Sequence, residues 1–157
     1  MNPLIRTTVT TVALLLAAAS AQSANLRYTY SAAGDEVIDS QTGLTWRRCS
    51  EGQTWSGATC TGTAATYTHE QALSRAHTQS GTAGWRLPNI KELVSIADKT
   101  RISPAIDVTA FPVTPSDWYW SSTPYAGDSS YAWLVYFYNG RVSDSYRNGS
   151  NHVRLVR

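Results

Sequence analysis

Few residues of this chain could carry out catalysis or bind a metal, and they stand far apart. The 157 residues include three histidines, His69, His77 and His152, and two cysteines, Cys49 and Cys60. They form no CxxC or HxxxH motif, whereas a zinc site needs several such ligands at suitable spacing. The sequence therefore predicts no metal site and no cofactor.

An enzyme is the less favoured interpretation of the polar residues near the C-terminus. Ser145, His152 and Asp144 are the residue types that a hydrolase uses as nucleophile, base and orienting acid, but no nucleophile-elbow motif accompanies them. Asp128 and Asp144 are the only acids after Asp117, which is weak support for a paired-carboxylate glycosidase. We therefore expect a protein without catalytic activity.

The last forty residues, 118–157, have the composition of a binding surface. They are built mostly from Ser, Tyr, Trp, Asn, Asp, Gly and Arg, and they contain no Lys, Glu, Gln or Cys. Tyr and Trp offer large contact areas with few rotatable bonds, while Ser, Gly and Asn offer adaptable hydrogen bonds, as in antibody combining sites. This composition predicts that the segment binds a ligand.

The N-terminal residues predict export. One charge, at Arg6, precedes an apolar run from Val9 to Ala19 and then small residues, which is the pattern of a secretory signal peptide. We place the end of this peptide at residue 21, with residue 24 as the alternative, so that 22–157 form a single domain. The apolar run is well below the roughly 20 residues that span a bilayer, and we expect no membrane span.

Export also determines what the cysteines and the charge imply. In an oxidising compartment, a lone pair such as Cys49 and Cys60 most simply forms a disulfide. The formal net charge is only +2, including Arg6 of the predicted leader, and this argues against a nucleic-acid partner. The protein is expected in the periplasm, outside the cell or on its surface.

Short strands and two helices are predicted to position the binding segment. Residues 27–30, 37–39 and 44–46 suit strands, and 40–43 suit a tight hairpin turn. Residues 51–66 are expected to form a loop that the disulfide holds. Residues 85–88 are extended before Pro88, and the proline-rich stretch 103–115 is an irregular connection.

Both predicted helices begin at a capping box. Thr68 with Gln71 opens a helix that reaches about residue 78 and buries Ala72, Leu73 and Ala76. Asn89 with Glu92 repeats the pattern before the apolar positions of a second helix. His69 and His77 are expected to be solvated residues of the first helix.

A hairpin is predicted where Asn139-Gly140 follows the strong strand 133–138, because this dipeptide favours two-residue turns. Such a turn pairs Tyr138 with Arg141, Phe137 with Val142, and Tyr136 with Ser143. The predicted core face is Trp133, Val135, Phe137 and Val142, and the predicted outward face is Tyr136, Tyr138, Arg141 and Ser143. A last strand, 153–156, is expected to lie beside an N-terminal strand.

Four motifs in order resemble the bacterial family typified by the C-terminal domain of the collagen-like adhesin Lcl. They are VIDSQTGLTW at 37–46, WRLPNIKEL at 85–93, WYWSS at 118–122 and VRLVR at 153–157. The resemblance implies an α+β, C-type-lectin-like fold, with two short helices packed on small antiparallel sheets and a loop-rich C-terminal half. Some relatives with this ending resemble variable proteins of diversity-generating retroelements, whose C-terminal codons are rewritten to vary a binding surface.

We therefore predict an exported ligand-binding module, a diversified receptor or adhesin, with an unknown protein or polysaccharide ligand. Its predicted ligand-binding residues are Tyr125, Asp128, Ser129, Tyr131, Tyr136, Tyr138, Arg141, Ser143, Asp144, Tyr146, Arg147, Asn148, Asn151 and His152. The alternative is an adhesin for sulfated polysaccharides, the ligand class that the resemblance implies, with Arg141, Arg147, Arg154 and Arg157 as candidate contacts, although we favour a solvated strand edge for Arg154 and Arg157. A formylglycine-generating type of enzyme is less favoured, since it needs reactive cysteines.

Overall fold

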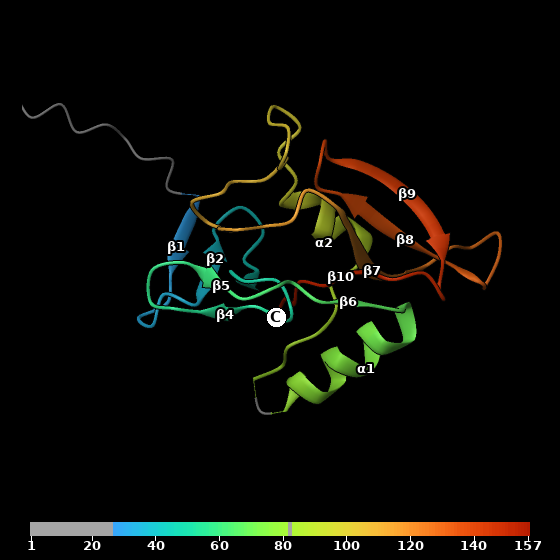
Figure 1. The fold of residues 1–157 in the computed structure, drawn as a ribbon, viewed down its shortest axis with the longest axis horizontal. Helices are drawn as coiled ribbons and strands as arrows, with labels where there is room; N and C mark the ends of the chain where they lie inside the picture. Colours follow the sequence, from blue (N-terminus) through green and yellow to red (C-terminus); the bar gives the residue numbers. More distant parts are fainter. Residues whose placement is uncertain (1–26, 82) are drawn as a thin grey trace, which may run out of the picture.

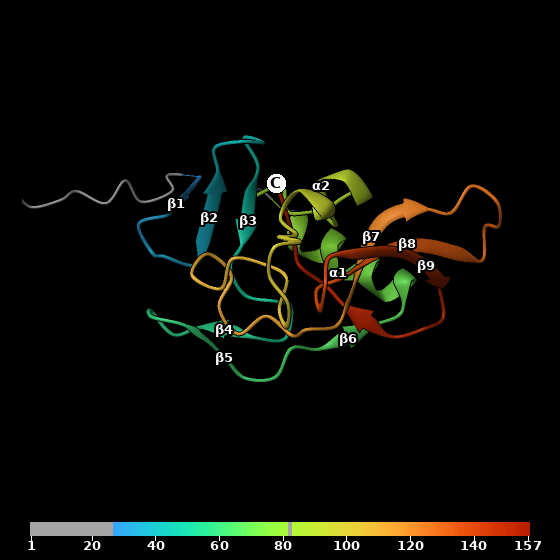
Figure 2. The same ribbon diagram turned by 90° about the horizontal axis from the view of Figure 1, so that it is seen from above.

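The computed structural model describes residues 27–81 and 83–157, and the predicted signal peptide lies outside these ranges. The described part is α+β, with two helices and ten strands in three small sheets. Figures 1 and 2 show the N-terminal sheet at one end of the long axis and the strands of the C-terminal hairpin at the other, with the helices towards the middle. The two larger sheets therefore lie toward opposite ends of the long axis.

The N-terminal sheet has the order β1-β2-β3, formed by Tyr28–Tyr30, Glu36–Asp39 and Thr45–Arg47. The predicted turn at 40–43 is present, with the Gly43 N–H donating to the Asp39 carbonyl at 2.8 Å. The C-terminal residues run beside β3, since the N–H of Thr45 bonds the carbonyl of Arg157 at 2.9 Å. The prediction that the chain's end returns to an N-terminal strand is confirmed, although 153–156 makes only isolated bridges.

The C-terminal sheet contains five strands in the order β6-β10-β7-β8-β9. They are Thr66–Tyr67 (β6), Asn151–His152 (β10), Trp118–Pro124 (β7), Tyr131–Tyr136 (β8) and Arg141–Tyr146 (β9). The sheet is not wholly antiparallel as predicted, because β10 pairs with β7 in parallel. Residues 51–66 are also more ordered than a loop, since they carry the two-stranded hairpin β4 (Thr54–Trp55) and β5 (Cys60–Thr61).

The helices α1 (His69–Ser80) and α2 (Ile90–Ser95) both begin at the predicted capping boxes. In each box the cap side chain accepts an N–H of the first turn and the third residue accepts the cap N–H. Two predictions about α1 are wrong. Leu73 is 36% exposed while His69 is only 1% exposed, because Ala72 and Ala76 form the narrow buried face and His69 turns inward at the helix start.

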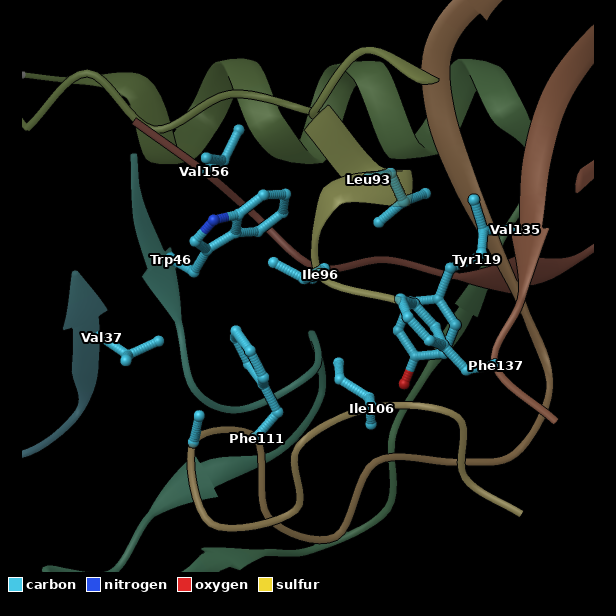
Figure 3. Packing of buried hydrophobic residues seen from close by; sticks show 11 residues of the cluster. Val37, Trp46, Leu93, Ile96, Ile106, Phe111, Tyr119, Val135, Phe137 and Val156 are labelled. Atoms are coloured by element: carbon cyan, nitrogen blue, oxygen red, sulfur yellow. The ribbon is translucent and has the colours of Figure 1, made fainter. Parts of the chain in front are cut away.

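Two apolar cores hold these elements together. Figure 3 shows the first, in which side chains of the N-terminal sheet, α2, the 103–115 connection and the C-terminal sheet meet: Val37, Trp46, Leu93, Ile96, Ile106, Phe111, Tyr119, Val135, Phe137 and Val156. The second places Ala72 and Ala76 of α1 against Trp120 and Leu134. Both faces of β7 and β8 are therefore covered near the middle of the sheet.

The predicted disulfide between Cys49 and Cys60 is present. It joins the segment after β3 to β5, and it thereby anchors the β4–β5 hairpin to the N-terminal sheet. The described residues contain no free cysteine. This pairing fits a protein that folds in an oxidising compartment.

Candidate ligand-binding surface

The hairpin of β8 and β9 does not have the predicted register. Tyr136 lies opposite Arg141, and Val135 lies opposite Val142. Residues 137–140 form the loop, and Gly140, with φ of 75°, donates its N–H to the Tyr136 carbonyl at 2.8 Å. The predicted two-residue turn at Asn139-Gly140 is therefore wrong.

Tertiary contacts explain this difference. The carbonyls of Phe137 and Tyr138 accept the N–H groups of Ala105 and Ser103 at 2.6 and 2.8 Å, so they bond the 103–115 connection instead of β9. The Phe137 ring packs against Tyr119 in the core, with 4.9 Å between ring centroids. Because the register moves by two residues, Val135, Phe137 and Val142 keep their predicted side of the sheet.

Aromatic rings form a stack at the loop end of the hairpin, which we call the Trp118 stack: Trp118, Tyr136, Tyr138 and Arg141. Trp118 and Tyr136 lie 4.5 Å apart at 18°, and Tyr136 and Tyr138 lie 5.6 Å apart at 27°. The guanidinium of Arg141 sits 5.3 Å from the Trp118 ring. Tyr138 is 40% exposed, so the stack opens to solvent at this end.

A second group of rings lies at the other end of the hairpin, and we call it the Tyr131 cluster: Tyr125, Tyr131, Trp133 and Tyr146. Tyr131 and Tyr146 face each other across β8 and β9 at 4.1 Å, and Tyr146 is 55% exposed. The pKa of Tyr131 is raised to about 12, mainly because of a hydrogen bond with Tyr146. Tyr125 meets Trp133 at 5.4 Å in an edge-to-face contact.

The loop between β7 and β8 holds Tyr125 in place. A Cβ at Gly127 would stand 2.7 Å from the Tyr125 ring, so this ring needs a glycine beside it. Asp128 accepts the Ser130 N–H at 2.8 Å, and its carbonyl accepts the Tyr131 N–H at 3.1 Å. Asp128 and Ser129 are exposed at the tip of this loop.

Trp133, which was predicted to lie on the core face, and Trp118 take part in the two surface clusters. Both are only half-buried and both contribute rings to the surface clusters. Trp133 does point to the same side of the sheet as Val135, but it lies beyond the edge of the core and packs on Tyr125 instead. The predicted outward face is also partly closed, because α1 covers Leu134.

Arg147 ties the Tyr131 cluster to the helix α1. Its Nε–H donates to Nδ1 of His69 at 3.0 Å, and His69 Nε2 lies 2.9 Å from the carbonyl of Ser121. Since arginine has no acceptor, His69 must be neutral with its proton on Nε2, donating to Ser121. Burial, chiefly, lowers the pKa of His69, and the charge of Arg147 lowers it further.

The remaining predicted binding residues divide between the surface and the interior. Asp144 and Asn148 are exposed, Ser143 and Asn151 are half-buried, and Asn148 joins Arg147 in lining a hollow of about 580 Å³. His152 is buried, with Nδ1 3.0 Å from the carbonyl of Ala65. The prediction that His152 faces a ligand is therefore wrong, because β10 lies between β6 and β7 inside the sheet.

Arg154 occupies an interior position that composition did not indicate. It is fully buried, and its terminal nitrogens donate to the carbonyls of Arg47 and Arg48 and to the hydroxyls of Ser50 and Thr114. It makes no ion pair with a carboxylate in the described ranges. Desolvation lowers its pKa.

The four sequence motifs lie within a segment that matches the model of a known protein family. Residues 35–157 match the model of the Lcl C-terminal domain. The chain belongs to this family. The match to the Lcl C-terminal domain includes both helices, both aromatic clusters and the buried Arg154, while β1 precedes it.

One further comparison and two structural features describe this Lcl C-terminal domain. No curated protein matches the chain. Neither helix in 27–81 and 83–157 is long and apolar enough to cross a membrane. Within those same ranges, no three His, Cys, Asp or Glu side chains gather as the ligands of a metal ion would.

Proposed function

We propose that this protein is an exported ligand-binding module with two aromatic contact surfaces, the Trp118 stack and the Tyr131 cluster, which lie on opposite faces of the sheet at the two ends of the β8–β9 hairpin. The observation that carries the proposal is the exposure of aromatic rings on a rigid sheet, with Tyr138 and Tyr146 the most open. Aromatic residues are enriched at protein interfaces because they bury much area at little entropic cost. Exposed clusters of this kind mark interaction sites.

A C-type-lectin-like fold is part of the same proposal. The N-terminal sheet and the chain's C-terminal end lie side by side, and the second sheet presents the 125–130 and 137–140 loops (Figure 1). This is the arrangement that the family resemblance leads one to expect. In a diversified receptor or adhesin, substitutions at exposed hairpin positions such as Tyr138, Asp144 and Tyr146 would change the ligand without disturbing the cores.

Three of the four arginines in the sulfated-polysaccharide alternative are held by contacts within the fold, although Arg147 keeps its charge because its partner His69 is neutral. Arg154 is buried, Arg147 bonds His69, and Arg157 pairs with Glu36 at 2.6 Å. Only Arg141 remains exposed without a carboxylate partner among the described residues. Tight binding of a polyanion rests on several cations at once, so we favour a ligand recognised through aromatic contacts.

We also propose that the protein is not an enzyme. Asp144 and Ser145 are neighbours on a strand and point to opposite faces. His152 lies in β10, which β7 and β8 separate from β9. These three side chains are therefore not positioned as nucleophile, base and orienting acid. Cys49 and Cys60 are bonded to each other and offer no thiol for oxidative chemistry.

Ligand capture on a peptide library and a glycan array tests the proposal. We expect Tyr138→Ala and Tyr146→Ala together to abolish retention of the binders selected by the unmodified domain. Tyr30→Ala is the matched control, because Tyr30 is 44% exposed but belongs to β1. Thermal unfolding verifies that each variant is folded. Unchanged retention by the folded double variant would show that the surface lies elsewhere.

A further inference from the structure

Arginines of this protein lie over many of its aromatic rings. Arg27 lies 4.8 Å from the Tyr28 ring, Arg48 lies 4.1 Å from the Trp55 ring, and Arg141 covers Trp118. The other rings with such a contact are Tyr30, Trp85, Phe111 and Tyr119. No described arginine or lysine lies over a ring of the Tyr131 cluster. This cluster is thus an aromatic site that lacks a cation from its own chain.

Two carboxylates lie close to the Tyr131 cluster. Six other carboxylates of the described residues pair with arginines: Asp35, Asp39, Glu36, Glu51, Glu92 and Asp98. Asp144 forms none of these pairs, and it lies opposite Trp133 on the neighbouring strand. Asp128 and Asp144 are both close enough to add to the raised pKa of Tyr131. The site therefore combines aromatic rings with two carboxylates that form no ion pair among the described residues, while the nearby Arg147 guanidinium is directed at His69.

The nearest arginine in sequence does not supply the missing cation. Arg147 directs its Nε–H to His69 at 3.0 Å and a terminal nitrogen to the carbonyl of Ser129 at 3.4 Å. Its backbone N–H also bonds the carbonyl of Ser130 at 2.8 Å. These contacts hold the guanidinium at α1 and at the loop backbone, and they fix the loop that carries Tyr125.

The rings of the Tyr131 cluster pack on one another and leave Tyr146 the most open. Tyr125 stands nearly perpendicular to its neighbours, at 69° to Tyr131 and 71° to Trp133, with centroids 6.4 and 5.4 Å away. Tyr146 packs against Tyr131, with 4.1 Å between ring centroids, and is 55% exposed. A cation that contacts this cluster would therefore approach the exposed part of the Tyr146 ring.

We propose that the Tyr131 cluster binds a cationic side chain, lysine or arginine, of an extended polypeptide partner. This inference rests on the proposed function and names the chemistry of its ligand. A polypeptide suits the site because Tyr146 is 55% exposed and β9 is the outermost strand of its sheet. An extended segment can pair along such an edge and place alternate side chains over the rings.

Short peptides test the inference directly. We would titrate the domain with an acetylated and amidated Ala-Lys-Ala-Lys-Ala peptide and follow the amide resonances of β9 by NMR. The same peptide with norleucine or glutamate in place of lysine is the control for charge, and tetramethylammonium is the control for a free cation. We expect measurable binding of the lysine peptide, weaker binding of tetramethylammonium, and none of the glutamate peptide.

Variants locate the contact. Tyr146→Leu should weaken the lysine peptide about 5- to 30-fold, the range of one aromatic–cation contact. Asp144→Asn, a change at an exposed and unpaired side chain, should weaken it about 3-fold, with the effect reduced by salt. Tyr30→Leu, at an exposed ring in β1, should leave it unchanged. Equal affinity for the lysine and norleucine peptides, or no effect of Tyr146→Leu and Asp144→Asn, would overturn the inference.

The experiments distinguish a cation on a polypeptide from a free cation, and they test the inference separately from the proposed function. Tetramethylammonium that binds as tightly as the lysine peptide would overturn the polypeptide partner. If the lysine peptide fails to bind while array retention still depends on Tyr138, the inference is wrong and the proposed function stands. If array retention depends on neither Tyr138 nor Tyr146, the proposed function fails as well.

Discussion

Acidification should destabilise this protein through His69. The neutral ring accepts a hydrogen bond from Arg147 and donates one to Ser121, and burial holds the pKa of His69 below the ordinary value of 6.5. Below pH 6.5, His69 is therefore protonated in the unfolded chain but stays neutral in the folded protein until the lower folded-state pKa is reached. The stability due to neutral His69 is fully present above this pH and is lost as pH falls toward the folded-state pKa.

The magnitude follows from the single proton involved. Between the two pKa values, one group changes the free energy of unfolding by at most about 1.4 kcal/mol per pH unit. Protonation would also turn Nδ1 into a donor that faces the Arg147 guanidinium, so the contact between α1 and Arg147 would break. His69 thus links the stability of α1 to the loop beside Tyr125.

Urea unfolding between about pH 5 and 8, where histidine titrates, measures this effect. His69→Gln should lower stability at pH 8, because the imidazole ring that bridges Arg147 and Ser121 and packs on Trp120 is lost, but it should remove the decline attributable to His69 on acidification. His77→Gln is the matched control, since His77 is exposed on the same helix. An identical pH slope in wild type and His69→Gln would refute the reasoning, and so would loss of the slope in His77→Gln.

Three further predictions concern stability and can be read from urea midpoints. Arg154→Ala should lower the free energy of unfolding by about 3 to 5 kcal/mol, since it leaves buried carbonyls unpaired and creates a cavity. Arg86→Ala, at the exposed pair with Glu92, should lower it by under about 1 kcal/mol. Equal losses in the two variants would contradict the burial of Arg154. Thr68→Ala should cost about 1 kcal/mol by removing the α1 cap, and Thr78→Ala, near the other end of α1, is its comparison. Replacing Cys49 and Cys60 with Ala should cost about 3 kcal/mol, and an unchanged midpoint under reducing conditions would argue against it.

Local signals in the sequence predicted much of the scaffold. The capping boxes at Thr68 and Asn89 depend only on residues three positions apart, and both helices begin where this pattern predicted. The strands of the N-terminal sheet and the Cys49–Cys60 disulfide follow equally local rules. Leu73 was misjudged because an apolar residue at the margin of a helical face needs the tertiary neighbour to decide its burial.

The candidate surface was predicted less well than the scaffold. Tyr138, Asp144 and Tyr146, which composition drew attention to, are exposed. Composition also included His152, which is buried, and it left out the surface roles of Trp118 and Trp133. Composition reports which residue types are present, but exposure depends on which strands become neighbours.

The sequence by itself determined the family, the helix starts, the disulfide and the aromatic composition of the C-terminal segment, because each depends on residue type and short spacing. Only the tertiary structure decided the register of β8 and β9, since Phe137 leaves the strand to enter a core assembled from distant segments. It also decided which arginines are free, because Arg154 and Arg147 find their partners across the fold. For the same reason, the grouping of Tyr125, Tyr131, Trp133 and Tyr146 could be recognised only once distant side chains had been placed in space.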